Sequence, residues 1–172
     1  FDVDAVLESF PECTVMMGVP TYYVRLLKSD ALDSELTKQM RLFISGSAPL
    51  LEETFNEFKQ RTKHLILERY GMTETNMNTS NPLKGDRKPG TVGLPLDDVQ
   101  VKVVDEKNNA LPQGEIGNIQ VKGPNVFKGY WQMPEKTKED FTEEGFFNTG
   151  DKGLIDEDGY VWIVGRSKDM II

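Results

Sequence analysis

The chain reads Leu65-Ile66-Leu67-Glu68-Arg69-Tyr70-Gly71-Met72-Thr73-Glu74-Thr75 where a short apolar run meets a polar turn. The run 65–67 predicts a strand, as do the earlier runs 14–19 and 42–45. Helical spacing of apolar residues follows each of the earlier runs, over 20–27 and 51–62. Short strands joined by helices favour a parallel α/β sheet, whose ligands collect at the carboxyl ends of the strands. Residues 70–75 come at such an end.

The residues of this turn suit a nucleotide and its metal. Tyr70 offers a ring on which a purine can stack, and Thr73 offers a hydroxyl to a phosphate oxygen. Glu74 offers a hard oxygen ligand for Mg²⁺. Gly71 lets the backbone turn at positive φ or approach a neighbouring segment. An ordinary polar turn after a strand would show the same residues, so other segments must decide.

The texture changes at about Asn81, where Gly and Pro begin to separate short alternating segments. Strands are expected over 99–104, 116–121 and 160–164, with one helix over 135–141, which indicates an antiparallel, barrel-like unit. We therefore expect an α/β subdomain over 1–95, a β-rich subdomain over 96–165 and a hinge over 166–172.

Composition excludes several classes of protein. The 172 residues are 38% hydrophobic and 28% charged, which is typical of a globular protein. A formal net charge of −8 argues against nucleic acid as a partner. No apolar run reaches the roughly 20 residues of a membrane span, and no signal peptide is evident, so a cytoplasmic protein is expected. The oligomeric state stays open.

Three further features are interpreted as structural. Cys13 precedes an apolar run and is expected to be a buried, inert thiol. His64 has no second histidine with which to form a metal pair or a catalytic triad. The segment 85–90 is glycine-rich and basic, but it lacks the ending of a phosphate loop and is expected to be a solvated turn.

Two later clusters add groups that could bind a nucleotide. Asp151 ends the segment 147–151 just after an expected glycine turn, where its carboxylate could accept hydrogen bonds from both ribose hydroxyls. The segment 165–169 places two cations beside an acid where a strand ends. A good turn and a surface ion-pair patch are the ordinary interpretations of these two clusters.

Five ordered blocks together resemble the adenylate-forming superfamily, which includes acyl-CoA synthetases, luciferases and the adenylation domains of peptide synthetases. The blocks are residues 45–50, 70–75, 114–131, 149–151 and 165–169. Within the superfamily, segments 15–23 and 68–78 are most similar to malonyl-CoA synthetases. The resemblance implies ATP, Mg²⁺ and CoA as cofactors or substrates, and a small carboxylic acid as the partner to be activated.

The resemblance also implies roles for individual residues, in a reaction that forms an acyl-adenylate and then a thioester. Ser47, Ala48 and Pro49 would line the space between adenine and acyl group. Tyr70, with Gly71 and Met72 beside it, would pack on the adenine, Thr73 would contact the α-phosphate and Glu74 would hold Mg²⁺. Asp151 and Arg166 would fix the ribose, and Lys168 matches the hinge.

The acid itself is less well defined. Malonate needs a cation for its second carboxylate, and Arg25 and Arg69 are the candidates, although each could equally be an ordinary surface arginine. Activation of a fatty, aryl or amino acid is the alternative within enzymes. A non-catalytic nucleotide-binding domain is the alternative from another class.

The family's phosphate loop and C-terminal domain have no counterpart in residues 1–172. The chain is therefore expected to be an internal fragment of a larger enzyme, and to be inactive alone because it lacks that loop and the catalytic lysine of the later domain.

Overall fold

The computed structural model describes residues 1–167. They form two compact units, each discontinuous in sequence. The first contains Phe1–Arg69 and Asn81–Gly90, and the second contains Tyr70–Ser80 and the chain from Thr91 onward. Residues 70–80 therefore belong with the later part of the chain, although they precede the boundary expected at residue 95.

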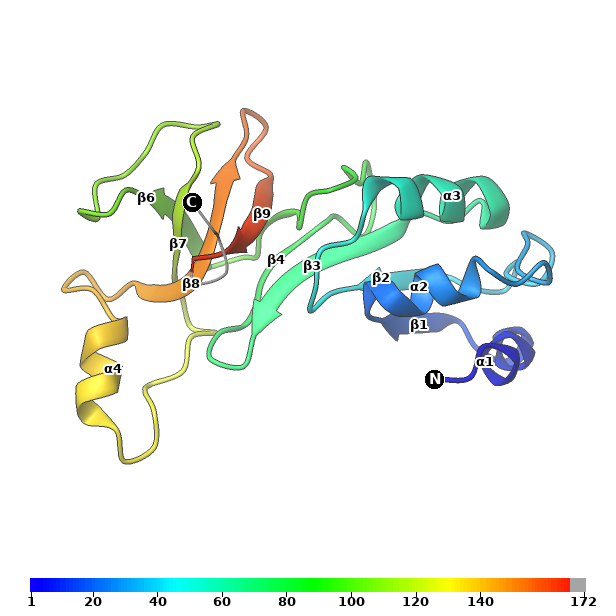
Figure 1. Cartoon of the computed structure of the whole chain (residues 1–172), viewed down its shortest axis with the longest axis horizontal. Helices are drawn as coiled ribbons and strands as arrows, with labels where there is room; N and C mark the ends of the chain where they lie inside the picture. The colour runs from blue at the N-terminus through cyan, green and yellow to red at the C-terminus, as the bar shows by residue number, and fades with distance from the viewer. Residues whose placement is uncertain (168–172) are drawn as a thin grey trace. The chain divides into compact units, whose positions relative to one another are not determined.

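A parallel sheet with helices forms the first unit (Figure 1). Its elements are α1 (Val3–Ser9), a 3-10 helix (Phe10–Glu12), β1 (Val15–Gly18), α2 (Pro20–Leu26), β2 (Leu42–Ser45), α3 (Glu52–Thr62) and the start of β3 (Ile66–Met72). Gly18 lies opposite Ser45, and Ser45 lies opposite Glu68. The carboxyl ends of β1 and β2 are thereby level with the middle of β3.

The helices begin and end where their sequences favour it. Pro20 occupies the first turn of α2, where its missing N–H costs no hydrogen bond. In α3, acidic residues stand in the first turn and basic residues in the last, which complements the helix dipole. Lys63 ends α3 in the left-handed region at φ 65°.

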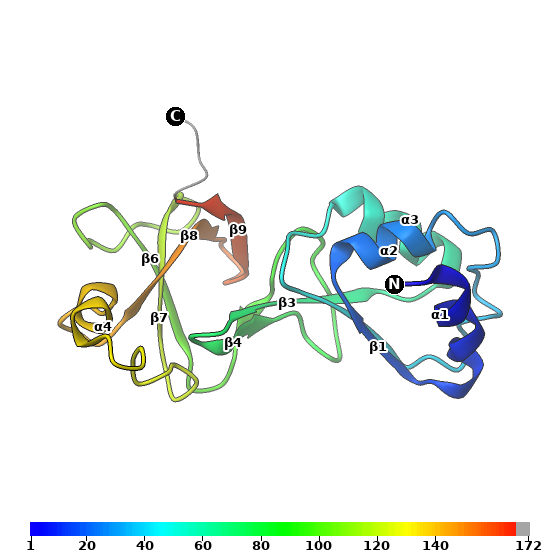
Figure 2. The same cartoon turned by 60° about the horizontal axis from the view of Figure 1, so that its bottom comes forward.

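Aromatic rings fill the core of the first unit. Phe43 of β2 packs edge-on against Phe58 of α3 at 4.9 Å between ring centroids, and Tyr23 of α2 packs against Phe58 at 5.4 Å. The Tyr23 hydroxyl donates to the Ile44 carbonyl at 2.6 Å, so its polar end is satisfied in the interior. Figure 2 shows α2 and α3 side by side over the strands of this unit.

Two expectations for the first unit are wrong. The strand 14–19 was expected to be buried, but Val15 and Met17 of β1 are 37% and 60% exposed, because β1 pairs only with β2 among the described residues. Cys13 was expected to be buried and is exposed. His64 accords with a structural role, since its Nε2 lies 3.0 Å from the Thr37 carbonyl and its ring packs on Phe43.

Antiparallel strands dominate the second unit. The end of β3 leads into β4 (Asn76–Ser80), which pairs with β5 (Leu94–Pro95). A separate four-stranded sheet has the order β6 (Gln100–Val104), β7 (Gly117–Lys122), β8 (Phe147–Ile155) and β9 (Val161–Arg166), and α4 (Pro134–Asp140) lies in the connection from β7 to β8 (Figure 1). The expected sequence of an α/β part and an antiparallel β-rich part is confirmed.

The segment 147–151 differs from the expected turn. It forms the first part of β8, in which Gly150 adopts φ 76° and the pairing with β7 is irregular. Phe147, Thr149, Asp151 and Gly153 alternate as buried positions along this strand. Asp151 is therefore held by a sheet and does not stand on a loop.

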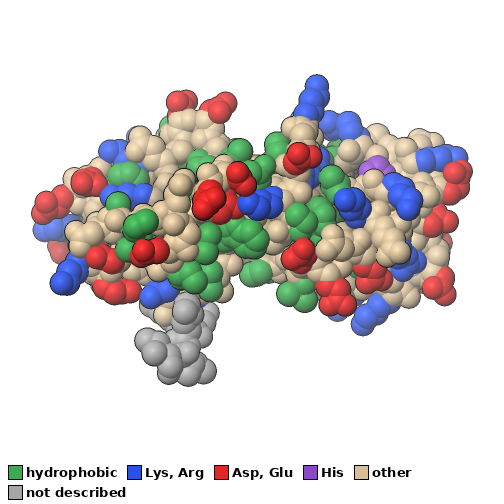
Figure 3. All heavy atoms as spheres, turned by 90° about the horizontal axis from the view of Figure 1, so that it is seen from above, with side chains coloured by type: hydrophobic (Ala, Val, Ile, Leu, Met, Phe, Trp, Pro, Cys, Tyr) green, Lys and Arg blue, Asp and Glu red, His purple; other side chains and the backbone are tan. Residues whose placement is uncertain are grey.

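No helix among residues 1–167 is long and apolar enough to cross a membrane. Acidic and basic side chains are interspersed on the face displayed in Figure 3.

Candidate functional site

The turn at residues 73–75 is held by a tight hairpin within the second unit. Gly71 lies in β3 and does not adopt a positive φ. A Cβ at this position would lie 1.9 Å from the Asn76 carbonyl oxygen, so only glycine permits the approach of the two strands. Of the two uses expected for Gly71, close backbone approach is the one observed. Thr73 is exposed and Glu74 half-buried at the tip.

Tyr70, Asp151 and Arg166 are joined in one cluster of the second unit. The Tyr70 hydroxyl donates to Asp151 Oδ2, and Arg166 Nε lies 3.1 Å from Asp151 Oδ1. Asp151 and Arg166 are directly opposite each other on β8 and β9. Three positions separated by up to 96 residues in sequence (70 to 166) thus meet around one carboxylate.

The three residues of this cluster differ in burial, and burial sets the protonation of Tyr70. Asp151 is 5% exposed and Tyr70 9%, whereas the Arg166 side chain is 58% exposed. Burial, followed by the charge of Asp151, raises the pKa of the Tyr70 hydroxyl far above its usual range, so Tyr70 acts as a hydrogen-bond donor. The Asp151 backbone N–H donates to Thr149 Oγ1 at 3.1 Å, which fixes the strand locally.

Glu74 makes polar contacts through both its backbone and its side chain. The Phe127 N–H donates to the Glu74 carbonyl at 2.8 Å, and the Tyr130 hydroxyl lies 3.4 Å from Glu74 Oε1. Burial, with the charges of Glu74 and Asp140, raises the pKa of Tyr130 to about 12. Tyr130 therefore keeps its proton at neutral pH.

Glu74 fits a magnesium ion that is held mainly by phosphates and water. The described residues contain no group of three or more His, Cys, Asp or Glu that could hold a metal on its own. Mg²⁺ in nucleotide sites is commonly bound through one or two carboxylates together with substrate phosphates. A single half-buried carboxylate with an exposed hydroxyl beside it matches that donor set.

In the first unit, Ser47, Ala48 and Pro49 form an exposed loop just past the carboxyl end of β2. Ser47 adopts the left-handed region at φ 66°. Gly46 begins this loop at a crowded position, because a Cβ there would lie 3.3 Å from the Arg69 carbonyl oxygen and 3.5 Å from Arg69 Cγ. The arginine side chain therefore runs alongside the start of the loop.

Glu68 is a buried carboxylate that the sequence did not single out. It is 4% exposed and accepts a hydrogen bond from the Gly90 N–H at 3.3 Å. Burial raises the pKa of Glu68 to about 7, against the opposing effect of backbone hydrogen bonds from Gly90 and Leu50. Glu68 thus links strand β3 to two neighbouring loops of its own unit.

The segment 85–90 is more ordered than a solvated turn. The Arg87 guanidinium donates to the carbonyls of Pro82 and Leu83 at 3.1 Å each, and also to the Leu65 carbonyl. Arg87 therefore ties this segment to the start of β3, whereas Gly85 and Asp86 are exposed, as expected of a solvated turn.

The two candidate arginines lie in different settings. Arg69 is half-buried against Gly46, and its Nη2 lies 3.8 Å from Met17 Sδ. Arg25 is exposed in the last turn of α2. Among residues 1–167, neither has a carboxylate at ion-pair distance. Lys168, the expected hinge residue, lies outside the described residues.

Comparison with known proteins identifies the family. The family described as AMP-binding enzyme matches residues 4–131. The chain belongs to the AMP-binding enzyme family. The resemblance inferred from the five sequence blocks is therefore confirmed.

Several proteins that are similar to this chain carry names that mention malonate or malonyl-CoA. The chain is 47% identical to a malonate–CoA ligase of Arabidopsis thaliana over 90% of its own length and 26% of that protein. The crystal structure of ATP-bound MatB from Rhodopseudomonas palustris matches all of this chain over 34% of the MatB chain, at 61% identity and a TM-score of 0.98. A malonyl-CoA ligase in a ternary product complex with methylmalonyl-CoA and AMP matches at 41% identity and a TM-score of 0.87, again over the whole chain and 38% of its own.

The chain of this AMP-binding family member spans about a third of the length of these relatives.

Proposed function

We propose that the chain is part of an ATP-dependent acid–CoA ligase. In the first step, a carboxylate oxygen attacks the α-phosphorus of ATP, and pyrophosphate leaves as the acyl-adenylate forms. In the second step, the CoA thiolate attacks the acyl carbon, and the bond from that carbon to the bridging oxygen breaks to release AMP. A thioester is the product. Cytoplasmic location stays a prediction.

The meeting of Tyr70, Asp151 and Arg166 is the observation that carries this proposal. These are the residues to which the family resemblance gives the adenine and ribose contacts, and they form one hydrogen-bonded cluster. A carboxylate held by two donors keeps its orientation, so its remaining lone pairs can accept from two adjacent ribose hydroxyls. A nucleotide fixed in this way supplies orientation, which is a large part of catalysis in nucleotidyl transfer.

The other residues have roles that suit their positions. Exposed Thr73 would donate to an α-phosphate oxygen, and Glu74 would hold Mg²⁺, which neutralises phosphate charge when bound. Ser47, Ala48 and Pro49 would contact the acyl-adenylate from their exposed loop. Gly71 and Met72 would follow Tyr70 along the nucleobase.

Product analysis of the full-length protein tests this proposal. The protein would be incubated with ATP, Mg²⁺ and CoA, and separately with malonate, methylmalonate, propionate, octanoate, benzoate and an amino acid. Mass spectrometry should find an acyl-CoA together with AMP and pyrophosphate in at least the malonate reaction. Formation of ADP would refute the proposal. Nucleotide binding with no acyl-CoA from any of these acids would also refute it, and would favour a non-catalytic nucleotide-binding domain.

We further propose malonate or a related short diacid as the substrate, with Arg69 as the cation for the distal carboxylate. Arg69 lies beside Gly46, at the edge where parallel strands present their ligands, and no carboxylate among the described residues neutralises it. Arg25 is five residues past Pro20, about 8 Å further along α2 at 1.5 Å per residue. Arg69 is thus the better placed of the two candidates.

Paired substitutions separate these arginines. Arg69→Met should lower kcat/KM for malonate by about 10- to 100-fold, the value of a lost charge-assisted contact. The same variant should leave kcat/KM for propionate within about threefold, because propionate has no second carboxylate. Arg25→Met should leave the malonate-to-propionate ratio unchanged. A ratio that responds to Arg25 and not to Arg69 would overturn the assignment.

A further inference from the structure

Tyr130 places one phenolic proton between two carboxylates. Its hydroxyl oxygen lies 3.4 Å from Glu74 Oε1 and 3.2 Å from Asp140 Oδ2. A hydroxyl has one proton to donate, so it cannot make two full hydrogen bonds to two anions. Both distances exceed the 2.7–2.8 Å typical of O–H···O bonds, as expected for a shared proton.

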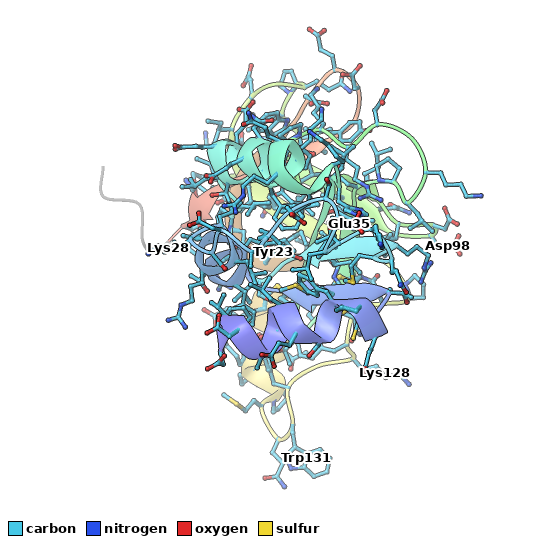
Figure 4. The ribbon with its side chains drawn as sticks, turned by 90° about the vertical axis from the view of Figure 1, so that its right-hand side faces the viewer. Tyr23, Lys28, Glu35, Asp98, Lys128 and Trp131 are labelled. Atoms are coloured by element: carbon cyan, nitrogen blue, oxygen red, sulfur yellow. The ribbon has the colours of Figure 1, made fainter. Side chains whose placement is uncertain are left out.

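The ring of Tyr130 is fixed from several sides. It packs edge-on against Phe127 at 4.8 Å between ring centroids, and its backbone N–H donates to Thr137 Oγ1 at 2.9 Å. Gly129 permits this contact, because a Cβ there would lie 2.7 Å from Thr137 Cγ2. The neighbouring Trp131, by contrast, is 87% exposed and points away from the fold (Figure 4). Only the tyrosine of this pair turns toward Glu74.

A lysine balances the second carboxylate. Lys136 Nζ lies 2.7 Å from Asp140 Oδ1 and 3.2 Å from Glu139 Oε2, all on α4. Asp140 therefore has a cation of its own, whereas no cation among the described residues pairs with Glu74. The Glu74 carboxylate consequently gains more than Asp140 from the hydrogen bond that the Tyr130 hydroxyl donates.

We propose that Tyr130, whose ring is held by packing on Phe127, is a positioning residue that orients the Glu74 carboxylate for its divalent cation through the proton that it shares between Glu74 and Asp140. The inference deepens the proposed function and rests on it. With one carboxylate oxygen held by the hydroxyl and the backbone carbonyl held by Phe127, the other oxygen is left in a defined direction. Groups that orient a metal ligand in this way commonly contribute 10- to 100-fold in metal affinity.

Metal binding and kinetics of the full-length protein test this role together. The first measurement is the dissociation constant for Mn²⁺, followed by its electron paramagnetic resonance signal, in the presence of the α,β-methylene analogue of ATP. Tyr130→Phe should raise this constant about tenfold, and should raise the Mg²⁺ concentration needed for half-maximal activity by a similar factor. The dissociation constant for AMP without metal should change less than about twofold, because the phenylalanine ring keeps the packing on Phe127.

Two further variants keep the test decisive if Tyr130→Phe does not fold. Asp140→Asn and Glu139→Gln each remove one carboxylate that contacts Lys136, but only Asp140 also contacts Tyr130. Asp140→Asn leaves a weaker acceptor, so the Tyr130 proton should shift toward Glu74 and the Mn²⁺ dissociation constant should fall severalfold. Glu139→Gln should change that constant less than twofold. Equal effects of the two variants, or an unchanged Mn²⁺ constant in Tyr130→Phe, would overturn the role of Tyr130. Absence of acyl-CoA formation by the wild type would instead overturn the proposed function.

Discussion

Asp151 is a buried carboxylate that contacts residues of two other strands. It is almost completely buried, and such a group is tolerated only when donors satisfy it. Tyr70 supplies one hydrogen bond and Arg166 a charge, and both come from other strands. Removing either partner should therefore affect stability as well as nucleotide binding.

Replacing Tyr70 with phenylalanine tests the stability effect. Tyr70→Phe leaves a buried carboxylate oxygen without its donor, so the free energy of unfolding should fall by about 1–3 kcal/mol. The control is Tyr22→Phe, because the Tyr22 hydroxyl has no hydrogen bond among the described residues while its ring stacks on Phe1 at 4.0 Å. Urea unfolding of both variants gives the comparison, and equal losses would contradict the importance of the Tyr70–Asp151 bond.

Glu68 should make stability depend on pH. Its pKa is raised from 4.5 to about 7 on folding, so the buried carboxyl is protonated in the folded state at pH values where the unfolded chain is ionised. The folded state binds more protons in that window, and stability is therefore lost as pH rises from about 4.5 to about 7. The shift corresponds to about 3 kcal/mol.

Glu68→Gln removes this titration. The free energy of unfolding of the variant, measured in urea at several pH values from 4.5 to 8, should rise relative to wild type as the pH increases. Parallel pH profiles of the two proteins would show that Glu68 ionises normally in the folded state.

Motifs pointed to candidate site residues but not to the contacts between them. Asp151 and Arg166 could be chosen because each lies within a recognisable block, yet their pairing depends on the register of β8 with β9. Tyr130 stood inside a matching block without a role, because its partner Glu74 is 56 residues away. Glu68 was overlooked because burial of a carboxylate between loops leaves no local pattern.

At the scale of elements, the β3–β4 hairpin sets the position of Glu74. Gly71 allows the two strands to approach, and the turn at 73–75 follows from that approach. Any side chain at this position would meet backbone atoms, which cannot move aside as a flexible side chain can.

Gly71→Ala should therefore destabilise the second unit by about 3 kcal/mol or more, in the range of severe steric conflicts. The matched control is Gly18→Ala at the end of β1, where the added Cβ would meet only side-chain atoms of Tyr22 and Met16, at 3.1 Å and 3.3 Å. Calorimetric unfolding should show the larger loss for position 71. A larger loss at position 18 would contradict the hairpin's dependence on glycine.

Periodicity found most elements but missed α1, the 3-10 helix, β4, β5 and β8, and two of these show why. Helix α1 has a clear start, since Asp2 Oδ1 accepts from the Ala5 N–H at 3.0 Å, and this N-cap could have been recognised. Strand β8 was harder, because polar Thr149 and Asp151 occupy its buried positions and Gly150 interrupts it. Strands that carry functional polar groups lose the alternation by which strands are recognised.

For the whole molecule, net charge and substrate chemistry oppose each other. A chain of formal charge −8 would have to bind ATP, CoA and a carboxylate, all of which are anionic. Under the proposed function, local cations such as Arg69 and Arg166 would supply the attraction. This is why composition argues against nucleic acid as a partner yet could not indicate the nucleotide that we propose as substrate.

We propose that the full-length protein activates its acid by attack of a carboxylate oxygen on the α-phosphorus of ATP. The most direct measurement supplies malonate labelled with ¹⁸O in its carboxylates, together with ATP, Mg²⁺ and CoA, and follows the label by mass spectrometry. We predict one ¹⁸O atom in each AMP formed, because the attacking carboxylate oxygen stays on phosphorus when the thiolate displaces AMP. Label in inorganic phosphate or pyrophosphate, or unlabelled AMP beside malonyl-CoA, would contradict it.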